Sequence, residues 1–253
     1  YNLKMETYIK KRITKIKNNI KQEIEDYIAL EKKVKIFINK TEIISLYCTP
    51  SMIKELTIGL LLTEGIIKDT ACDFEITISN DDILVNLNSK DFEPMDLNQI
   101  RHLCGFTISK EKTFNKIKDD FSIPFLKLKE LFEEFQNRCE LFRLTGCFHS
   151  SAIADKSRVI EFAEDIGRHN SVDKVIGSCI LKNIFLNDKM IFVSCRLSSE
   201  ILFKCATWSI PLIASISAPT ASAVDIAEKT GITLIGFFRN DKANIYTNKH
   251  RVI

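Results

Sequence analysis

Polar and apolar residues alternate in two stretches near the start of the chain. One stretch, "KKVKIFINKTEIISLYC", predicts two short strands that meet around Asn39–Thr41. The other covers residues 74–88 and predicts a hairpin that turns at Asn80–Asp82. Between them, the apolar run in "TPSMIKELTIGLLLTEGII" is typical of a buried helix, with Ser51 as its N-cap and Gly65 as its stop signal.

The pattern changes after Pro124, where apolar residues recur at helical spacing. The residues that share this helix face are Leu128, Leu131, Phe132 and Phe135. Further strands are expected at 147–154, 158–163, 190–195, 211–216, 232–238 and 243–247, and further helices at 171–183, 199–208 and 219–230. Because strands alternate with helices, we expect an α/β fold with a largely parallel sheet that helices cover on both faces.

A long segment without periodicity, residues 90–112, separates the two halves. Such irregular segments are uncommon in compact domains and often carry function. We therefore expect a smaller β-rich α+β piece over residues 1–112, which ends in the loop that contains Cys104. A three-layer α/β domain should occupy residues 113–253.

Composition and charge are typical of a globular protein, except at the start of the chain. Of the 253 residues, 45% are hydrophobic and 27% are charged, and the net charge is +3. Residues 1–40 contain 11 Lys and Arg against 5 Asp and Glu, a net charge of +6, which leaves −3 for the rest. Because these cations do not alternate with aromatic residues, we expect a lysine-rich, solvated helix here rather than a nucleic-acid site.

The sequence contains neither a membrane-spanning pattern nor a signal-peptide pattern. Charges run through the first 20 residues, and no apolar run approaches the ~18–20 residues of a membrane span. We expect a cytoplasmic protein that binds neither membranes nor nucleic acid.

Cysteine spacing indicates a reducing compartment. Cysteines stand at positions 48, 72, 104, 139, 147, 179, 195 and 205, and no two of them form a CxxC pair. Four of these lie in apolar runs and should behave as small hydrophobes: Cys139, Cys179, Cys195 and Cys205. Cys104 differs, because neighbouring Arg101 and His102 would lower the pKa of its thiol. A reactive thiol and a quiet buried thiol both remain open for Cys104.

A zinc site finds no support in the sequence. His149 is followed by two serines, whereas zinc deaminases need an H-x-E motif and a later PCxxC motif. We expect no zinc and no other metal ligand set. A hydrolase or deaminase on this architecture would need such a metal.

The most polar of the strand-to-helix connections reads "AEDIGRHNSVDK" (163–174). Asn170 could cap the following helix, with Asp173 as its capping-box partner. Capping does not account for the ionisable residues just before it, which are Glu164, Asp165, Arg168 and His169.

Two further strand-to-helix connections consist mostly of small and polar residues. "SCRLSSE" (194–200) places Arg196 and Ser198 at a helix start, and "SAPTAS" (217–222) does the same for Ser217 and Thr220. Ligands of α/β sheets bind where strands end and helix N-termini begin, so an arginine among hydroxyls suits a phosphate or pyrophosphate. Ordinary N-capping is the alternative for each connection alone. Neither a Walker nor a Rossmann glycine motif is present.

Taken in order, these motifs resemble the FdhD/NarQ family of formate dehydrogenase accessory sulfurtransferases. "EDIGRHNSVDK" is nearly the family's signature, and "LTGCFHSSA" and "SCRLSSE" resemble two more motifs. In these, Cys147 and Cys195 stand where the family has glycine. "SISAPTASAVDIAEKTGITLIGFFR" followed by "NIYT" resembles the C-terminal signature.

The resemblance implies a function and a set of partners. Members take persulfide sulfur from a cysteine desulfurase and pass it to the molybdenum (or tungsten) bis-pyranopterin guanine dinucleotide cofactor, which then enters formate dehydrogenase. Their fold is similar to the cytidine deaminase architecture without the zinc. A homodimer, a cysteine desulfurase and the formate dehydrogenase catalytic subunit are therefore the expected partners.

The resemblance also implies roles for single residues. Cys104 matches the first cysteine of the family's C-x-x-C loop and would carry the persulfide, but Thr107 replaces the second cysteine. Cys147 or Cys195 could stand in for it. A chaperone that binds the cofactor and has lost sulfur transfer is therefore the alternative function.

For the cofactor, the resemblance points to "FFRNDK" (237–242) and to the polar connections. Phe237 or Phe238 would stack on the guanine and Arg239 would pair with phosphate. Arg168 would bind an anion and His169 would donate or accept hydrogen bonds in the cleft. The full cofactor set also includes Asn240, Asp241, Lys242, Arg196, Ser198, Ser217 and Thr220.

Overall fold

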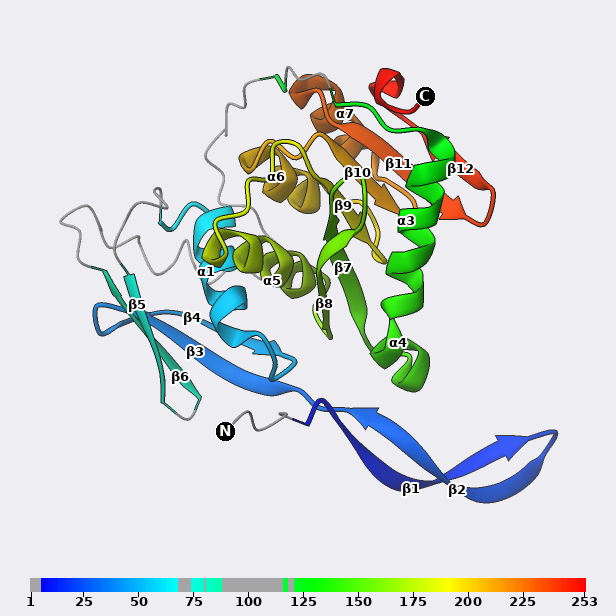
Figure 1. Cartoon of the computed structure of the whole chain (residues 1–253). Coiled ribbons are helices and arrows are strands. Elements are labelled where there is room, and N and C mark those ends of the chain that lie inside the picture. Colours follow the sequence, from blue (N-terminus) through cyan, green and yellow to red (C-terminus); the bar gives the residue numbers. More distant parts are fainter. Residues whose placement is uncertain (1–5, 68–73, 80, 88–115, 118–120) are drawn as a thin grey trace.

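The computed structural model describes residues 6–67, 74–79, 81–87, 116–117 and 121–253. Three β-sheets and a set of helices make up this part of the chain (Figure 1). In chain order the elements are β1 (Tyr8–Lys17), β2 (Ile20–Ala29), β3 (Lys32–Ile38), β4 (Thr41–Cys48), α1 (Ile53–Thr63), β5 (Phe74–Ser79), β6 (Asp82–Leu87), α3 (Phe125–Arg138), α4 (Glu140–Thr145), β7 (His149–Ala154), β8 (Val159–Asp165), α5 (Arg168–Leu181), β9 (Met190–Val193), α6 (Ser199–Thr207), β10 (Leu212–Ser215), α7 (Ala221–Thr230), β11 (Thr233–Arg239), β12 (Lys242–Ile245) and the 3-10 helix η1 (Lys249–Arg251).

The basic N-terminal segment forms a hairpin, so the helix expected there is wrong. Strands β1 and β2 pair antiparallel over ten residues each, and the hairpin extends away from the rest of the molecule (Figure 1). Asn18 and Asn19 form the connection with φ of 49° and 64°, as a two-residue hairpin turn requires. The strands are rich in β-branched Ile, which favours extended backbone over helix.

The four-stranded sheet confirms the strands and the hairpin predicted near the start of the chain. Its order is β4-β3-β6-β5, and Asn39 with Lys40 makes the tight turn between β3 and β4. Helix α1 ends before Gly65, whose φ of 72° confirms the expected stop. Ser51 is not its N-cap: Met52 holds that position, and the Ser51 hydroxyl lies 3.4 Å from the Lys174 Nζ.

The six-stranded sheet has the order β12-β11-β10-β9-β7-β8. Strands β9, β10 and β11 pair in parallel, whereas β7 pairs antiparallel with both β8 and β9, and β11 pairs antiparallel with β12. The expectation of a largely parallel sheet is therefore wrong for three of the five pairs. Short turns join β7 to β8 and β11 to β12, and a short turn has no room for a parallel crossover.

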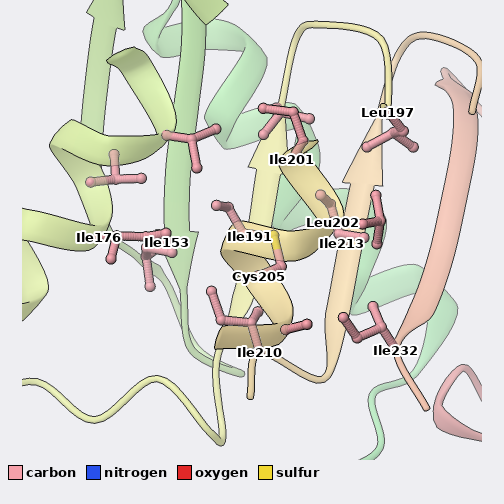
Figure 2. Packing of buried hydrophobic residues seen from close by; sticks show 14 of the residues in the cluster. Ile153, Ile176, Ile191, Leu197, Ile201, Leu202, Cys205, Ile210, Ile213 and Ile232 are labelled. Atoms are coloured by element: carbon pink, nitrogen blue, oxygen red, sulfur yellow. The ribbon is translucent and has the colours of Figure 1, made fainter. Parts of the chain in front are cut away.

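Helices cover both faces of this sheet, as predicted. Ile191 and Val193 face a core formed with α5, α6 and α7, while the alternate residues Met190 and Phe192 face a core formed with α3. Figure 2 shows the first core, where side chains from α6 such as Ile201 pack on strand residues. The likeness to cytidine deaminases stays a prediction.

Helix α1 attaches the four-stranded sheet to the rest by packing on α5. Two glycines permit this contact. A Cβ at Gly59 would lie 1.9 Å from the Asp173 carbonyl oxygen, and one at Gly177 would lie 1.9 Å from that of Glu55. The two helix backbones therefore touch directly. The proposed boundary at 112/113 falls outside the described residues and remains a prediction. None of the helices that the structure describes is long and apolar enough to cross a membrane.

Candidate functional site

The predicted polar connections meet at one edge of the six-stranded sheet. Strands β8, β9, β10 and β11 run in the same direction, because β7 is antiparallel to both β8 and β9. Their C-terminal ends therefore share an edge, and His149 at the start of β7 pairs with Asp165 there. Leu197 N–H donates to Ala218 C=O, and Thr220 N–H donates to Leu197 C=O, which joins two of the connections directly. The three polar connections therefore lie together at one edge of the sheet.

A pocket of about 360 Å³ opens beside this edge, between the N-terminal elements and helices α5 and α6. Tyr47 of β4 and Glu64 after α1 form one wall, while His149, Arg168 and His169 belong to the other. Both halves of the chain therefore build the pocket, although all of the predicted ligand residues were expected from the second half.

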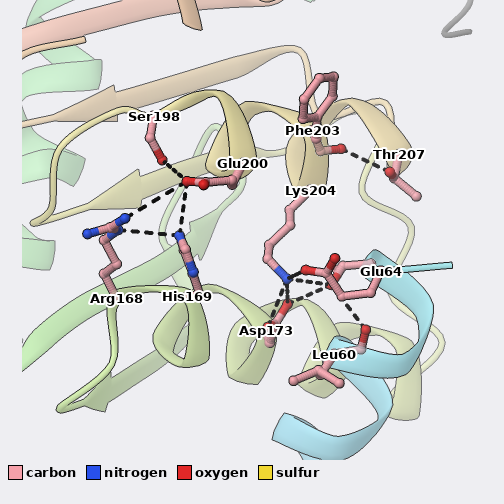
Figure 3. A network of polar contacts seen from close by, with 11 residues as sticks. Leu60, Glu64, Arg168, His169, Asp173, Ser198, Glu200, Phe203, Lys204 and Thr207 are labelled. Atoms are coloured by element: carbon pink, nitrogen blue, oxygen red, sulfur yellow. Dashed lines mark hydrogen bonds and ion pairs between the residues drawn. The ribbon is translucent and has the colours of Figure 1, made fainter. Parts of the chain in front are cut away.

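Three of the predicted residues gather around Glu200 at the start of α6 (Figure 3). The Ser198 hydroxyl donates to Glu200 Oε2 at 2.9 Å. Arg168 Nη2 and His169 Nε2 lie 3.9 and 3.6 Å from the same oxygen. Arg168 Nε–H also donates to His169 Nε2 at 3.3 Å, which requires a neutral imidazole.

Burial, with help from neighbouring positive charges, keeps both histidines of the pocket neutral. Burial, helped by the positive charges of Lys204 and Arg168, lowers the pKa of His169 to about 4. Burial and the charges of Arg168 and Arg196 lower the pKa of His149. The pocket wall therefore presents two imidazoles that can accept or donate a hydrogen bond without carrying charge at neutral pH.

A second cluster, more deeply buried but also lining the pocket, lies one helical turn further along α5 (Figure 3). Lys204 Nζ contacts both carboxylate oxygens of Asp173, at 2.9 and 3.0 Å, as well as Glu64 and the Thr63 hydroxyl. Burial raises the pKa of Asp173 to about 6. Burial alone would lower the pKa of Lys204, but Asp173 and Glu64 outweigh it and raise that pKa, so the pair is ionised at neutral pH.

The remaining carboxylates of the motif hold backbone in place. Asp165 forms a buried ion pair with Lys174 at 2.6 Å and accepts hydrogen bonds from Thr49 N–H and the Asn170 amide. Glu164 accepts from two backbone N–H groups at the start of α4. These two carboxylates therefore tie the loop to β4 and to the start of α4.

Asn170 is not the N-cap of α5, and Asp173 is not its capping-box partner. The helix begins three residues earlier than that cap would place it, at Arg168, with Gly167 in the N-cap position. The Asn170 amide instead donates to Tyr47 C=O at 3.0 Å, since both lie at the junction with β4.

The other connections place their polar residues as follows. Arg196 is exposed, and its charge acts on His149 across the pocket edge. Thr220 caps α7, where its hydroxyl accepts the Ala223 N–H at 3.3 Å. Ser217 C=O accepts the Phe237 N–H at 3.0 Å, which brings the last predicted segment to the same edge.

Within residues 237–242 the two phenylalanines separate. Phe237 lies in an irregularity of β11 with φ of 52° and is 43% exposed. Phe238 is 1% exposed and stacks on Phe132 with a centroid distance of 4.4 Å. The structure therefore excludes Phe238 as a stacking residue for a ligand and leaves Phe237.

The polar residues of this segment lie at the surface. Arg239 Nε–H donates to Ile216 C=O at 3.1 Å, and Asn240 occupies the turn before β12 with φ of 51°. Asp241 forms an ion pair with Lys129, and Lys242 is exposed at the start of β12.

Comparisons with known proteins support the family resemblance that the motifs indicate. The model of the FdhD/NarQ family matches residues 29–253. The chain belongs to this family. It is 34% identical over 237 residues to "Sulfur carrier protein FdhD" of Bacillus pumilus (strain SAFR-032), with 90% of each chain covered. It is also 34% identical over 249 residues to the protein of that name from Sulfolobus acidocaldarius, with 96% and 98% covered.

A solved structure supports the same assignment. A putative formate dehydrogenase accessory protein from Desulfotalea psychrophila superposes with a TM-score of 0.82 at 26% identity. The match covers 98% of this chain and 100% of that chain. The FdhD/NarQ fold therefore extends over the whole site edge described above.

For this FdhD/NarQ chain, most described cysteines are too buried to react. The buried thiols are those of Cys48, Cys139, Cys179, Cys195 and Cys205, and Cys147 is exposed. Burial raises the pKa of Cys195 to about 11 and that of Cys48 to about 12. Burial therefore disfavours Cys195 as a substitute for the missing loop cysteine. Cys104 and Thr107 lie outside the described residues.

The sequence did not single out several residues of the site. Glu200 and Lys204 lie four apart on an otherwise apolar helix, a signal that also fits a solvated pair. Tyr47 and Glu64 come from the other half of the chain and carry no local signal at all. Among the residues that the structure describes, no three His, Cys, Asp or Glu side chains come together as metal ligands.

Proposed function

We propose that this protein is a cytoplasmic sulfur carrier that serves formate dehydrogenase. It accepts sulfur from a cysteine desulfurase and passes it to the molybdenum (or tungsten) bis-pyranopterin guanine dinucleotide cofactor, which is its substrate. The catalytic subunit of formate dehydrogenase then receives the cofactor. One observation carries this proposal: the motif-bearing connections of the FdhD/NarQ chain meet at one sheet edge, beside a pocket.

The edge suits the anionic part of the cofactor. Arg168 and Arg196 supply charge at two neighbouring helix starts, and helix N-termini attract phosphate oxygens. Ser198, Ser217 and Thr220 lie along the same edge and offer hydrogen bonds.

The guanine end would bind further along the edge. Phe237 offers an exposed ring for stacking, and Arg239 lies two residues on. Asn240, Asp241 and Lys242 form the adjoining surface turn, where they would recognise the base edge and ribose. His169 would contact the substrate as a neutral hydrogen-bonding group.

The sulfur step assigned to Cys104 is a thiol–persulfide exchange. The Cys104 thiolate attacks the terminal sulfur of the persulfide on the desulfurase. The new S–S bond forms on Cys104 as the desulfurase S–S bond breaks, and the desulfurase cysteine leaves as a thiolate. Burial of five other cysteines supports this choice, because a buried thiol of raised pKa is a poor nucleophile.

Intact-mass analysis tests the assignment. The full chain is incubated with a cysteine desulfurase and cysteine, and compared with Cys104→Ala. The matched control is Cys147→Ala, which removes the exposed cysteine of the described part. We expect a gain of one sulfur atom in the wild type and in Cys147→Ala, and its loss in Cys104→Ala. An adduct that persists in Cys104→Ala contradicts the role of Cys104.

The replacement at Thr107 favours a second candidate, a chaperone that binds the cofactor without sulfur transfer. Without a second loop cysteine, sulfur cannot be relayed between neighbouring thiols. This alternative predicts no sulfur adduct on the wild type and GDP binding that is unchanged in Cys104→Ala. A sulfur adduct on the wild type would rule it out.

A further inference from the structure

The pocket between the two halves of the chain has a balanced charge. Its ionised side chains are two carboxylates and two cations: Glu64, Asp173, Arg168 and Lys204. Because both of its histidines are held neutral, these charges cancel. An anion therefore gains little by entering the pocket, and the phosphates of a ligand would stay at the sheet edge beside Arg168 and Arg196. A neutral polar group suits the interior better.

The pocket also has an aromatic and aliphatic lining. Tyr47 is 56% exposed, and the buried residues Ile44, Leu46 and Leu60 contribute aliphatic surface. Flat heterocycles bind to such surfaces, because their faces stack on aromatic rings. The volume of about 360 Å³ lies within the range of small-molecule sites. These features favour a planar ring as the occupant.

Glu64 has unused hydrogen-bonding capacity on this wall. Lys204 Nζ donates to its Oε1 at 2.6 Å, and among the residues that the structure describes no donor lies within hydrogen-bond distance of its Oε2. The side chain lines the pocket and is 17% exposed. Its position is fixed, because the same Lys204 Nζ also binds Asp173 (Figure 3). A fixed carboxylate with a free oxygen is a good acceptor for two parallel N–H groups.

His169 can supply a donor next to this carboxylate. Burial dominates the lowered pKa of His169, but the negative charge of Glu64 also acts on that pKa, which places the two groups near each other. His169 Nε2 accepts the Arg168 Nε–H, so the imidazole proton resides on Nδ1. Two acceptors and one donor are complementary to a ligand edge that has two N–H groups beside a carbonyl. The 2-amino-4-oxopyrimidine ring has this edge.

We propose that the pocket binds the 2-amino-4-oxopyrimidine ring of a bicyclic heterocycle, with Glu64 accepting its two N–H groups and Tyr47 stacking on its face. Guanine and pterin share this ring. The inference rests on the proposed function, whose cofactor contains both heterocycles. Because the guanine is placed at Phe237, the pterin is the expected occupant of the pocket.

Calorimetric titration of the full chain with two pteridines tests this site. Pterin carries the 2-amino group, whereas lumazine has an oxygen there and would present an acceptor to Glu64. We expect pterin to bind at least about tenfold more tightly, since a charge-assisted hydrogen bond distinguishes the two ligands. Glu64→Gln should remove most of this preference. Tyr47→Ala should weaken both ligands about fivefold or more, because stacking does not depend on the ring's edge.

Two further variants serve as controls. Tyr47→Phe keeps the aromatic ring and should bind both pteridines as the wild type does. Phe185→Ala removes a ring that is 82% exposed and lies outside this pocket, so both affinities should stay unchanged. Chemical denaturation shows whether Glu64→Gln, which alters a partner of buried Lys204, remains folded. Tyr47→Ala tests the pocket independently of that ion pair.

Guanosine and GDP distinguish the two sources of the ring and the two levels of the proposal. If Glu64→Gln and Tyr47→Ala weaken guanosine, the edge recognition holds and guanine is the occupant. Equal affinities for pterin and lumazine in the wild type, or pterin binding that neither variant changes, overturn the proposal. Binding of GDP without binding of pterin or sensitivity to these variants overturns the pocket assignment alone. Absence of binding of both GDP and pterin contradicts the proposed cofactor as well.

Discussion

The first two turns of helix α5 contain two polar clusters that do opposite things. Asp173 and Lys174 are at most 1% exposed, and each is an ion-pair partner that joins α5 to other elements. Arg168 and His169 keep 32% and 21% of their side chains exposed; besides the hydrogen bond between them, they make only long contacts to Glu200. A single motif therefore supplies both the buried ion pairs of Asp173 and Lys174, which we call the clamp, and the partly exposed Arg168 and His169, which we call the rim of the pocket. The two groups differ in how deeply they are buried.

The clamp explains why the rim is well placed. Asp173 and Lys204 hold the end of α1 through Thr63 and Glu64, while Lys174 and Asn170 hold the end of β4. Because Tyr47 and Glu64 form the other wall of the pocket, the buried pairs fix the distance between its walls.

Breaking the clamp should give the largest effect. In Lys204→Met the carboxylate of Asp173 stays buried without its cation, and loss of one partner of a buried pair costs about 3–5 kcal/mol. We expect a fall of that size in the free energy of unfolding, measured by chemical denaturation.

Lys182→Met, at the C-cap of α5, is the matched control. Lys182 also pairs with a carboxylate, that of Glu161, but its own side chain is 57% exposed. Water can replace this partner, so the free energy of unfolding should fall by less than about 1 kcal/mol. Equal losses in the two variants would mean that the buried pair is no clamp.

The dependence of folding stability on pH should show whether His169, at the rim, is held neutral in the folded chain. The pKa of His169 is about 4 in the folded chain, against 6.5 for an ordinary histidine. Below pH 6.5 the unfolded chain binds a proton that the folded chain refuses until about pH 4. The stability that neutral His169 provides is thus complete above pH 6.5 and is lost as the pH falls to about 4.

The comparison with His169→Gln isolates this effect. Asp173, with a pKa raised to about 6, acts in the opposite direction over the same range and is common to both chains. The wild type should lose on the order of 1–3 kcal/mol more than the variant between pH 7 and pH 4. Parallel stability curves would show that His169 is not held neutral.

The sequence was most informative where structure is local. Alternation located β3, β4 and the β5–β6 hairpin, and helical spacing located α3. The three polar connections reached one edge because strand directions in an α/β sheet are constrained, whichever pairs are antiparallel. The β1–β2 hairpin also had a local signal, Asn18–Asn19 between isoleucine-rich runs, but the lysine content outweighed it in the interpretation.

The predictions that were wrong concern residues whose roles depend on contacts between distant parts of the chain. Asn170 has the right type and position for an N-cap, yet its amide is used by Tyr47 and Asp165. Phe237 and Phe238 are equivalent in sequence, and only the irregularity in β11 decides which of them faces the core. Such outcomes are set by tertiary packing, which no local pattern encodes.

The smallest effect on stability, and the most specific one, should come from the rim itself. Arg168→Gln removes a charge that makes a single long ion pair, so the free energy of unfolding should change by less than about 1 kcal/mol. If Arg168 binds phosphate, its loss should weaken GDP binding roughly tenfold, as expected for one charge-assisted hydrogen bond. Calorimetric titration with GDP measures this, with Arg158→Gln as the control, because Arg158 is exposed in the turn at the opposite end of β7 and β8. An unchanged affinity in Arg168→Gln would move the anion site away from α5, whereas a large loss of stability would mean that the rim belongs to the clamp.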